Sequence, residues 1–393
     1  MIAHYRQVLN DPLRLAAYRY AIEEVLTPGD TFLEIGCGLG TYSMLAVQAG
    51  ASRVYAIDPN PIVQTARELA KTNNVHDHID FTQTRSEDFD IPERVDWIIT
   101  EFFGASAVDL FLTNTLADAA SRFLKPHGRM IPCAVTIYVA PIECPKIYQD
   151  HLHQVSSHVQ DLDFSSTATQ MANYPLYSDL TPCRLLTPPS QIAQSQLPVE
   201  PQSSLCTQTT FPCTEAGTIH GFGIWFDLDL TPGVSLSTAP TEPSLAWQKI
   251  FLPLERPIPV KPDTRVSLDL QAHAGLNDEI WWRWEGHRRH TAKGRPAWHF
   301  HQNSFKSIPL PSRPTVGPSL DTPLEKSAVG EEMYFLLSQV NGQSTFDALA
   351  KSLQTFSPYR YPTEDKARIR LTELGELLQE VSTTNSPSLR QLL

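Results

Sequence analysis

The chain has 393 residues, 41% of them hydrophobic, and a formal net charge of −12. This length allows two or three domains, each with its own core, and the acidic balance argues against the basic surface that nucleic-acid binding requires. No apolar run approaches the ~20 residues of a membrane span and the N-terminal stretch lacks the apolar segment of a signal peptide, so we expect a cytoplasmic protein that does not enter a membrane.

The first strong pattern is a glycine-rich turn between two predicted strands. The elements are a helix over Asp11–Leu26, a strand over Thr31–Ile35, a helix over Tyr42–Gln48 and a strand over Arg53–Ile57. The turn, GCGLG, contains Gly36, Gly38 and Gly40. Glycines in such a turn let the backbone approach a ligand closely. Asp58 follows the second strand, where a carboxylate can accept hydrogen bonds from both hydroxyls of a ribose.

The spacing of this turn favours one nucleoside cofactor over another. G-x-G-x-G is shorter than the dinucleotide pattern G-x-G-x-x-G, and the acidic Glu34 just before it suits a cationic ligand better than a pyrophosphate. The pattern therefore predicts S-adenosylmethionine rather than NAD. The alternative is a tight strand-to-helix turn that binds nothing, and the position of Asp58 argues against it.

Alternating strands and helices continue to about residue 138. Further strands are predicted over Ile79–Thr82, Trp97–Thr100 and Arg129–Cys133, with helices over Pro61–Thr72 and Phe111–Phe123. This alternation predicts an α/β domain of residues 1–138, with a parallel, Rossmann-like sheet covered by helices on both faces.

The sequence pattern changes after residue 138. Short β-rich runs are separated by Pro, Ser and Thr turns; they are Val135–Ala140, Ile219–Leu230, Ala246–Pro253, Arg265–Ala272 and Glu279–Trp284. They predict a sandwich or barrel domain of residues 139–308, interrupted by a helical insertion near 150–177. A Pro-rich linker covers 309–325. Amphipathic helices over Glu331–Gln339, Thr345–Leu353 and Thr363–Glu380 predict a small C-terminal module of residues 326–393.

Five motifs in order make residues 5–300 resemble the class I protein arginine methyltransferases. They are LNDPLRLAAYRYAI from Leu9, RSEDFDIP from Arg85, VDWIITEFFG from Val95, FLKPHGRMIP from Phe123 and the segment WFDLDL…STAPTEPSLAWQKIFLPLE from Trp225. The resemblance implies a β-barrel substrate domain, a peptide or protein substrate and a homodimer that forms through the helical insertion.

The resemblance also assigns roles to individual residues. It implies that Arg14 binds the methionine carboxylate of the cofactor, a sound pairing for a guanidinium. Ser86 and Glu87 take the places of the adenine-contacting loop, where Glu87 can accept from the exocyclic amine. Glu101 takes the place of the first glutamate of the substrate loop, and Trp247 that of a tryptophan near the active site. For Glu101 the plain alternative is a surface acid at a strand end.

The substrate half departs from the family pattern. A second glutamate is expected in the substrate loop, but a gap-free alignment places Leu110 there, with Asp109 just before it. The family's Thr-His-Trp loop reads Leu245-Ala246-Trp247, so its histidine is missing. We predict that Glu101 and Asp109 form the catalytic pair if the loop shifts by one residue. Otherwise Leu110 leaves an apolar pocket that suits a less charged nucleophile.

Other segments predict structure or function less specifically. EIWWRWEGHRRH from Glu279 is either an anionic or peptide-binding surface or, more in keeping with its pattern, an edge strand with stacked Arg–Trp pairs. His299 and His301 have no acidic or Cys partner at ligand spacing, so no metal is expected. The six cysteines are scattered without a CxxC pair, which predicts reduced thiols and no disulfide. The segment Phe335–Leu353 resembles small winged-helix peptide-binding modules, or it is a simple helical cap.

Three hypotheses for function remain. The first is S-adenosylmethionine-dependent N-methylation of an arginine-like nitrogen in a peptide or protein. Methyl transfer from a sulfonium is an in-line displacement, so the main task of the enzyme is to hold donor and nucleophile aligned. The second keeps the chemistry but takes a small-molecule amine or an oxygen nucleophile. The third is an inactive, cofactor-binding homologue that acts as a peptide-binding partner.

Overall fold

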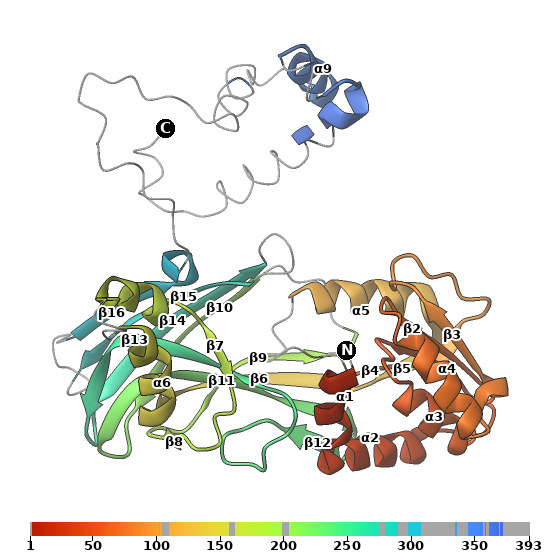
Figure 1. Ribbon diagram of the computed structural model, residues 1–393, viewed down its shortest axis with the longest axis horizontal. Helices are drawn as coiled ribbons and strands as arrows, with labels where there is room; N and C mark the ends of the chain where they lie inside the picture. Colours follow the sequence, from red (N-terminus) through yellow and green to blue (C-terminus); the bar gives the residue numbers. More distant parts are fainter. Residues whose placement is uncertain are drawn as a thin grey trace. The chain divides into compact units, whose positions relative to one another are not determined.

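The computed structural model describes residues 2–101, 103, 110–156, 162–198, 204–274, 280–289, 298–307, 335, 345–356, 358, 361–368 and 370–371 (Figure 1). The chain divides into two units, Met1–Leu310 and Pro311–Leu393. Each unit is described below by itself.

A five-stranded parallel sheet lies in the N-terminal part of the first unit, in the order β3-β2-β1-β4-β5. Its strands are β1 (Thr31–Ile35), β2 (Arg53–Asp58), β3 (Ile79–Gln83), β4 (Val95–Thr100) and β5 (Leu124–Ile131). The helices around it are α1 (Ile2–Leu9), α2 (Pro12–Val25), α3 (Thr41–Gln48), α4 (Val63–Thr72), the 3₁₀ turn His76–His78 and α5 (Leu110–Phe123). Every residue of β1 is buried, as expected for a central parallel strand. The predicted α/β sheet is confirmed.

Two antiparallel sheets form the rest of this unit. The larger has the order β7-β13-β11-β6-β8, with β12 paired to β11 and β9 paired to β6, and the smaller has the order β10-β14-β15-β16. The first strands are β6 (Ala134–Glu143), β7 (Leu176–Ser178), β8 (Arg184–Leu185), β9 (Ser190–Gln196), β10 (Ser204–Pro212) and β11 (Gly217–Thr231). The others are β12 (Val234–Ser237), β13 (Lys249–Val260), β14 (Arg265–Ala274), β15 (Ile280–Arg289) and β16 (Trp298–Asn303), followed by the 3₁₀ turn Ser304–Ser307.

The tryptophan-rich strand is not an edge strand, so that part of our prediction is wrong. β15 pairs with β14 on one side and β16 on the other. Trp282 and Trp284 are buried in the core, and Trp281 stacks on Phe305 with ring centroids 4.2 Å apart rather than on an arginine. Side chains alternate along a strand, so every second residue, including Trp282 and Trp284, points inward. The sequence contained this spacing but did not show which face of the strand is buried.

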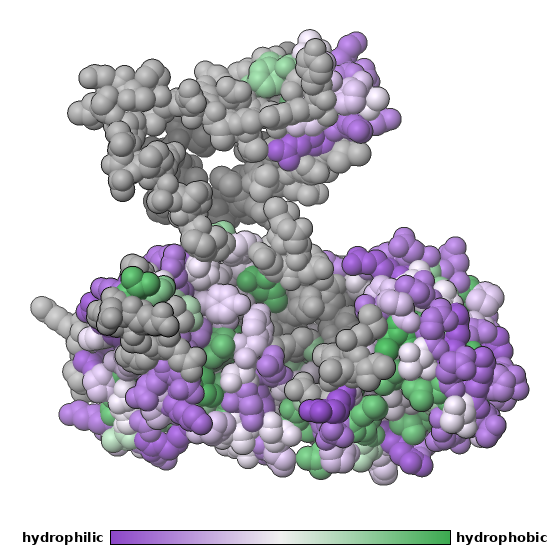
Figure 2. All heavy atoms as spheres, in the orientation of Figure 1, coloured by the Kyte–Doolittle hydropathy of each residue, from purple (hydrophilic) through white to green (hydrophobic). Residues whose placement is uncertain are grey.

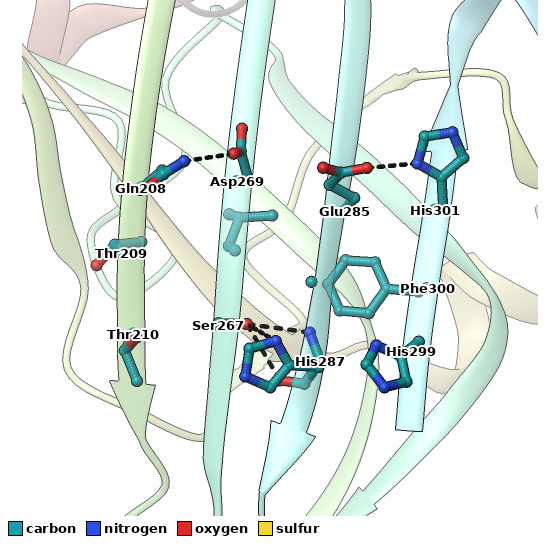
Figure 3. Close-up of a pocket in the computed structure, with 12 residues that line it drawn as sticks. Gln208, Thr209, Thr210, Ser267, Asp269, Glu285, His287, His299, Phe300 and His301 are labelled. Carbon is teal, nitrogen blue, oxygen red and sulfur yellow. Dashed lines mark hydrogen bonds and ion pairs between the residues drawn. The ribbon is translucent and has the colours of Figure 1, made fainter. Parts of the chain in front are cut away.

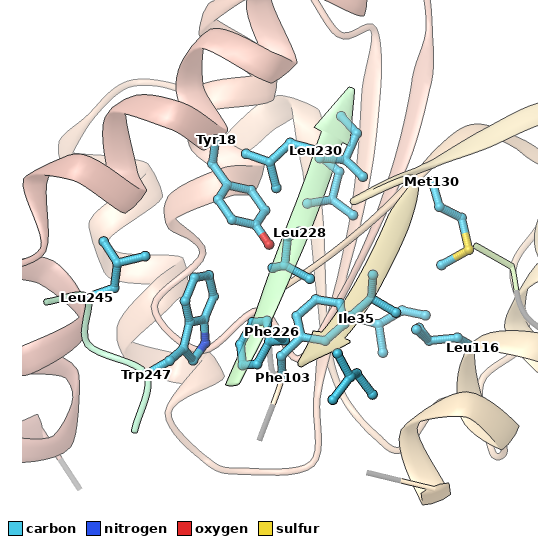
Figure 4. Close-up of a cluster of buried hydrophobic side chains, with 14 of the residues drawn as sticks. Tyr18, Ile35, Phe103, Leu116, Met130, Phe226, Leu228, Leu230, Leu245 and Trp247 are labelled. Atoms are coloured by element: carbon cyan, nitrogen blue, oxygen red, sulfur yellow. The ribbon is translucent and has the colours of Figure 1, made fainter. Parts of the chain in front are cut away.

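The parallel and antiparallel parts share one core, which differs from our expectation of separate cores. A single cluster of buried side chains includes residues of the parallel sheet and of both antiparallel sheets. Figure 4 shows the junction, where Phe226, Leu228 and Leu230 of β11 lie beside Tyr18 of α2 and Ile35 of β1. Because this apolar surface is buried on both sides, the two parts are held as one body at the place where the candidate site lies.

The helical insertion follows β6 and begins earlier than expected. It consists of α6 (Pro145–Ser156), the 3₁₀ turn Ser165–Thr167 and α7 (Ala168–Ala172). A disulfide joins Cys144, just before α6, to Cys183, just before β8. The prediction that all cysteines are free thiols is therefore wrong for this pair. The two lie 39 residues apart in sequence, so their proximity depends on the fold that brings both ends of the insertion together.

The second unit contains α9 (Phe346–Phe356), and residues 364–368 and 370–371 are also helical. Its small apolar cluster consists of Phe335, Leu349, Ala350, Leu353, Tyr361, Ala367 and Leu371. Apart from Phe335, the helix expected over Glu331–Gln339 lies outside the described residues. In the part of the chain that the structure describes, none of the helices has both the length and the apolar character needed to cross a membrane.

Candidate functional site

A cavity of about 300 Å³ lies at the carboxyl ends of β1, β2 and β4. Parallel α/β sheets place their ligands at this edge. The wall includes seven of the residues singled out from the sequence: Arg14, Glu34, Gly36, Gly38, Asp58, Glu101 and Trp247. The structure therefore brings five of the eight expected cofactor residues together with Glu101 and Trp247 in one cavity.

The glycine turn has the backbone conformation that its sequence implies. Gly36 and Gly38 have φ values of 74° and 51° and line the cavity. A Cβ at Gly38 would lie 2.5 Å from Cε1 of Tyr5, which lines the cavity from α1. Gly40 differs: it is the N-cap of α3, and a Cβ there would lie 2.7 Å from Phe81 rather than in the cavity.

Asp58 is buried and fastens the glycine turn to the end of β2. Its Oδ2 accepts from the backbone N–H of Gly38 at 2.9 Å, and its Oδ1 accepts from the N–H of Asn60 at 2.8 Å and from the Asn60 side-chain amide at 3.1 Å. An ionised carboxylate offers about four acceptor positions, so it can still receive hydroxyl donors. Asp58 thus combines an anchor for the turn with a remaining acceptor.

Replacing Asp58 by alanine should make the binding free energy of S-adenosylhomocysteine less favourable by about 1.5–3 kcal/mol, the scale of a hydrogen bond to a charged group. Calorimetric titration measures this change. Asp80→Ala is the matched control, because Asp80 forms a partly exposed ion pair with Arg53 on the neighbouring strand. Equal affinities in Asp58→Ala and wild type would contradict the cofactor role of Asp58.

Arg14 is 1% exposed and is held by three elements. Its Nη1 donates to Oε1 of Glu101 at 2.5 Å, and its Nη2 donates to the carbonyl oxygen of Val8 at 2.7 Å. The guanidinium carbon lies 5.0 Å from the ring centroid of Trp247. Nε is buried and makes no hydrogen bond, with the Oδ2 of Asp11 3.9 Å away. One nitrogen of Arg14 is thus left for a further acceptor.

Burial controls the protonation of the two glutamates in the cavity. It raises the pKa of Glu101 to about 7 even though the guanidinium of Arg14 acts to lower it. It raises the pKa of Glu34 to about 8, against hydrogen bonds from the backbone N–H and hydroxyl of Ser43. Near neutral pH both groups are poised between charged and neutral forms, a property found at many functional sites.

Asp11 links the two halves of the site. It caps α2, where its Oδ1 accepts from the N–H of Arg14 at 3.1 Å. Its Oδ2 accepts from the N–H of Ala246 at 2.7 Å, in the loop before β13. Trp247 follows and packs edge-on against Phe226, with centroids 5.6 Å apart (Figure 4). One buried carboxylate therefore fixes the loop that carries Trp247 beside the helix that carries Arg14.

Ser86 and Glu87, which were expected to contact the adenine, are not among the described residues that line this cavity. Ser86 is buried and its hydroxyl makes no hydrogen bond, while Glu87 accepts from the hydroxyl of Thr115 in α5 at 2.9 Å. Asp109 lies outside the described residues. Leu110 is the first residue of α5, but its side chain is also outside them.

Sequence reasoning missed several residues of the site. Among them, Asp11, Tyr42, Asn60 and Phe103 contribute to it or line the cavity. An aspartate directly before Pro12 is a recognisable helix N-cap signal, so Asp11 could have been found. Tyr42 and Phe103 carry no local signal, because only the fold turns them toward the cavity.

A larger hollow lies elsewhere, on the outer face of the four-stranded sheet. Its volume is about 620 Å³, and Figure 3 shows three pairs among its polar side chains, Gln208–Asp269, Ser267–His287 and Glu285–His301. Gln208 donates to Asp269 at 2.6 Å, and Glu285 contacts His301 at 2.5 Å. Among the described residues, no group of three His, Cys, Asp or Glu side chains could hold a metal ion. This hollow lacks the unpaired donors of the smaller cavity.

Comparison with known proteins agrees with this geometry. Residues 19–135 match the family model of ribosomal protein L11 methyltransferase (PrmA), and residues 134–310 match that of the PRMT5 oligomerisation domain. A probable protein arginine N-methyltransferase 6.2 of Oryza sativa subsp. indica is 30% identical over 307 residues, which cover 68% of this chain and 78% of the relative. The chain belongs to the protein arginine N-methyltransferase family.

Solved structures of this family share the fold. The Trypanosoma brucei PRMT1 enzyme–prozyme complex with AdoHcy has a TM-score of 0.68 at 23% identity, covering 76% of this chain and 96% of that one. Arabidopsis thaliana protein arginine methyltransferase 10 has a TM-score of 0.66 at 22% identity, covering 77% and 98%. The family membership and the match to a methyltransferase family model make this chain a class I methyltransferase whose cofactor is S-adenosylmethionine.

The residues present fit that cofactor. Asp58 has a remaining acceptor for the ribose, and Gly38 lines the cavity without a side chain, where a Cβ would meet Tyr5. The buried Nε of Arg14, which lacks a hydrogen bond, suits a carboxylate.

Proposed function

We propose that this methyltransferase methylates a guanidinium nitrogen of arginine in a peptide or protein. One observation carries the proposal: the cavity already holds a guanidinium, that of Arg14, between the carboxylate of Glu101 and the ring of Trp247. A carboxylate and an aromatic face are the groups that recognise such a cation. Within the described residues, Oε2 of Glu101 accepts no hydrogen bond, which leaves it for a second guanidinium.

The roles of the residues follow from their positions. When bound, S-adenosylmethionine supplies an activated methyl group. Arg14 and Asp58 hold the cofactor, while Glu101 orients the substrate guanidinium and stabilises its positive charge. Asp109 would supply the second carboxylate, and Leu110 would line the pocket beside it.

A second candidate substrate is a small molecule that contains a guanidinium. A Streptomyces achromogenes relative named arginine N(omega)-methyltransferase is 28% identical over 273 residues, covering 67% of this chain and 74% of the relative. Its name supports free arginine as an alternative to a peptide.

The test incubates the full chain with labelled S-adenosylmethionine and either an arginine-containing peptide or free arginine. Transfer to the peptide, located on the arginine side chain by fragment mass spectrometry, is the expected result. Transfer to free arginine alone would select the second candidate. If neither is methylated while S-adenosylhomocysteine still binds, the guanidinium proposal is wrong and an inactive homologue or another nucleophile is favoured. Leu110→Glu, which restores the family's acid, should maintain or improve transfer to arginine.

We also propose that the chain forms a homodimer through the helical insertion. The match of residues 134–310 to an oligomerisation domain supports an oligomer. Leu162 and Tyr174 in the insertion are 63% and 51% exposed, and Leu13 and Tyr20 form an exposed apolar stripe on α2. In the orientation of Figure 1, Figure 2 shows hydrophobic residues on the surface around α1 and α2. Docking one apolar surface on the other in a second copy would bury both.

Deleting His151–Tyr174 would remove most of the helical insertion, but single substitutions test this interface better. Deletion would also remove Asn173, whose side chain accepts from the N–H of Asn303 at 2.9 Å. Leu162→Glu and Tyr174→Glu should instead shift the protein to monomers in sedimentation at micromolar concentration. Phe305→Glu, at another exposed aromatic position, should leave the dimer intact. A monomeric wild type would rule out the interface.

We further propose a cytoplasmic location, since Cys37, Cys133, Cys206 and Cys213 are free thiols. Cys144 and Cys183 are both buried, which would protect their disulfide from cellular reductants. Alkylation of rapidly denatured cell extract followed by mass spectrometry measures how much of the pair is oxidised in the cell.

A further inference from the structure

Two residues that line the cavity each have a buried polar atom that makes no hydrogen bond. The atoms are Nε of Arg14 and the hydroxyl oxygen of Tyr42, whose residues are 1% and 4% exposed. Buried donors in proteins are nearly always paired, and an unpaired one costs about 1–3 kcal/mol. Two unpaired donors on residues that line one cavity indicate a ligand that offers acceptors to both.

The ring of Tyr42 is held firmly in place. Tyr42 is the second residue of α3, and its ring stacks on Tyr18 of α2 with centroids 4.5 Å apart and an angle of 26° between the rings. The hydroxyl of Tyr18 donates to the carbonyl oxygen of Thr100 at 3.0 Å. The two stacked tyrosines therefore differ: one hydroxyl is used by the fold and the other is not.

The hydroxyl of Tyr42 is a hydrogen-bond donor throughout the physiological pH range. Burial raises its pKa well above the ordinary value, and the charges that act on it belong to Glu101, Arg14, Glu34 and Asp11. Each of the three carboxyl groups has its own partner, Glu101 through Oε1 with Arg14, Glu34 with Ser43, and Asp11 with the backbone at Arg14 and Ala246, and none of them accepts from the Tyr42 hydroxyl. Because Tyr42 and Arg14 line the same cavity, a ligand group with acceptor atoms, such as a carboxylate, can serve the donors of both.

We propose that the Tyr42 hydroxyl binds the carboxylate of the cofactor's methionine part, in addition to Arg14, to which the family resemblance already assigns this group. Tyr42 is then a cofactor-binding residue specific for the amino-acid end of the ligand. The inference rests on the cofactor and not on the proposed arginine substrate, so its test needs no methyl acceptor.

The experiment compares two ligands on Tyr42→Phe, which keeps the ring stack and removes only the hydroxyl. S-adenosylhomocysteine contains the carboxylate, whereas 5′-methylthioadenosine has the nucleoside and the thioether without it. Calorimetry should show that the variant binds S-adenosylhomocysteine about 10-fold more weakly, the scale of one hydrogen bond to a charged group. The affinity for methylthioadenosine should be unchanged, which also shows that the variant is folded.

Tyr18→Phe is the matched control, since it removes the other hydroxyl of the same stack. Any effect of that variant should be the same for both ligands, because its hydroxyl binds the backbone. If Tyr42→Phe weakens both ligands equally, or weakens neither, the proposed contact with the carboxylate does not exist. Failure of the arginine assay with a ligand-selective loss in Tyr42→Phe would leave this inference intact and reject only the substrate.

Discussion

Replacing Glu101 by glutamine should reduce methyl transfer by about 100- to 1,000-fold, the loss typical when one group that stabilises charge in the transition state is removed. Glutamine keeps the shape but cannot neutralise a guanidinium. The affinity for S-adenosylhomocysteine should stay equal or rise, because Arg14 is then no longer bound to a charged competitor at 2.5 Å. Steady-state kinetics and calorimetry on the same preparation separate the two effects.

The pH profile gives an independent check on Glu101. Burial raises its pKa to about 7, and only the ionised form holds a guanidinium, so kcat/KM of the wild type should rise with pH through this value. Glu101→Gln should lack this rise. If the rise persists in the variant, the titrating group is another one, and Glu34, with a pKa of about 8, is the first candidate. A variant with wild-type turnover would remove Glu101 from the mechanism.

Gly38→Val should eliminate measurable binding of S-adenosylhomocysteine. Gly38 has φ +51°, and a Cβ would lie 2.5 Å from the ring of Tyr5, so the added side chain must displace Tyr5 or enter the cavity. Either outcome changes the wall where the backbone approaches the ligand. We expect an affinity at least 100-fold weaker in calorimetry, with methyl transfer lost in parallel.

Gly29→Val controls for backbone strain in this experiment. Gly29 has φ +101° but no atom within 4 Å of an added Cβ, so this variant carries the strain of about 1–3 kcal/mol without a new contact in the cavity. Its melting temperature should fall as in Gly38→Val, while its cofactor affinity should stay close to wild type. Tight binding by Gly38→Val would show that the glycine turn does not face the cofactor.

Much of the cofactor half could be predicted from the sequence because its signals are local. The glycine turn, the strand before it and Asp58 after the next strand lie within 28 residues, and a parallel sheet places all strand ends at one edge. Glu101, which directly follows β4, was assigned by the family resemblance. The family motifs added Arg14 and Trp247, whose partners lie far away in the sequence.

The pairings within the site were decided only by the tertiary structure. Asp11 binds the N–H of Ala246 across 235 residues, and Arg14 binds Glu101 across 87. The disulfide between Cys144 and Cys183 likewise depends on the fold that closes the insertion. No short pattern encodes such contacts, because they require two segments to be packed against a common core.

The sequence by itself determined the alternation of strands and helices, the cofactor class and the family, since each follows from nearby residues or ordered motifs. Only the tertiary structure decided that one continuous core unites the two parts and that Tyr42 and Arg14 line one cavity, each with a buried donor that makes no hydrogen bond. The physical reason is burial: water is removed from these groups by segments from both parts of the chain. The burial that raises the pKa of Glu101 also leaves the donors of Arg14 and Tyr42 without water as a partner.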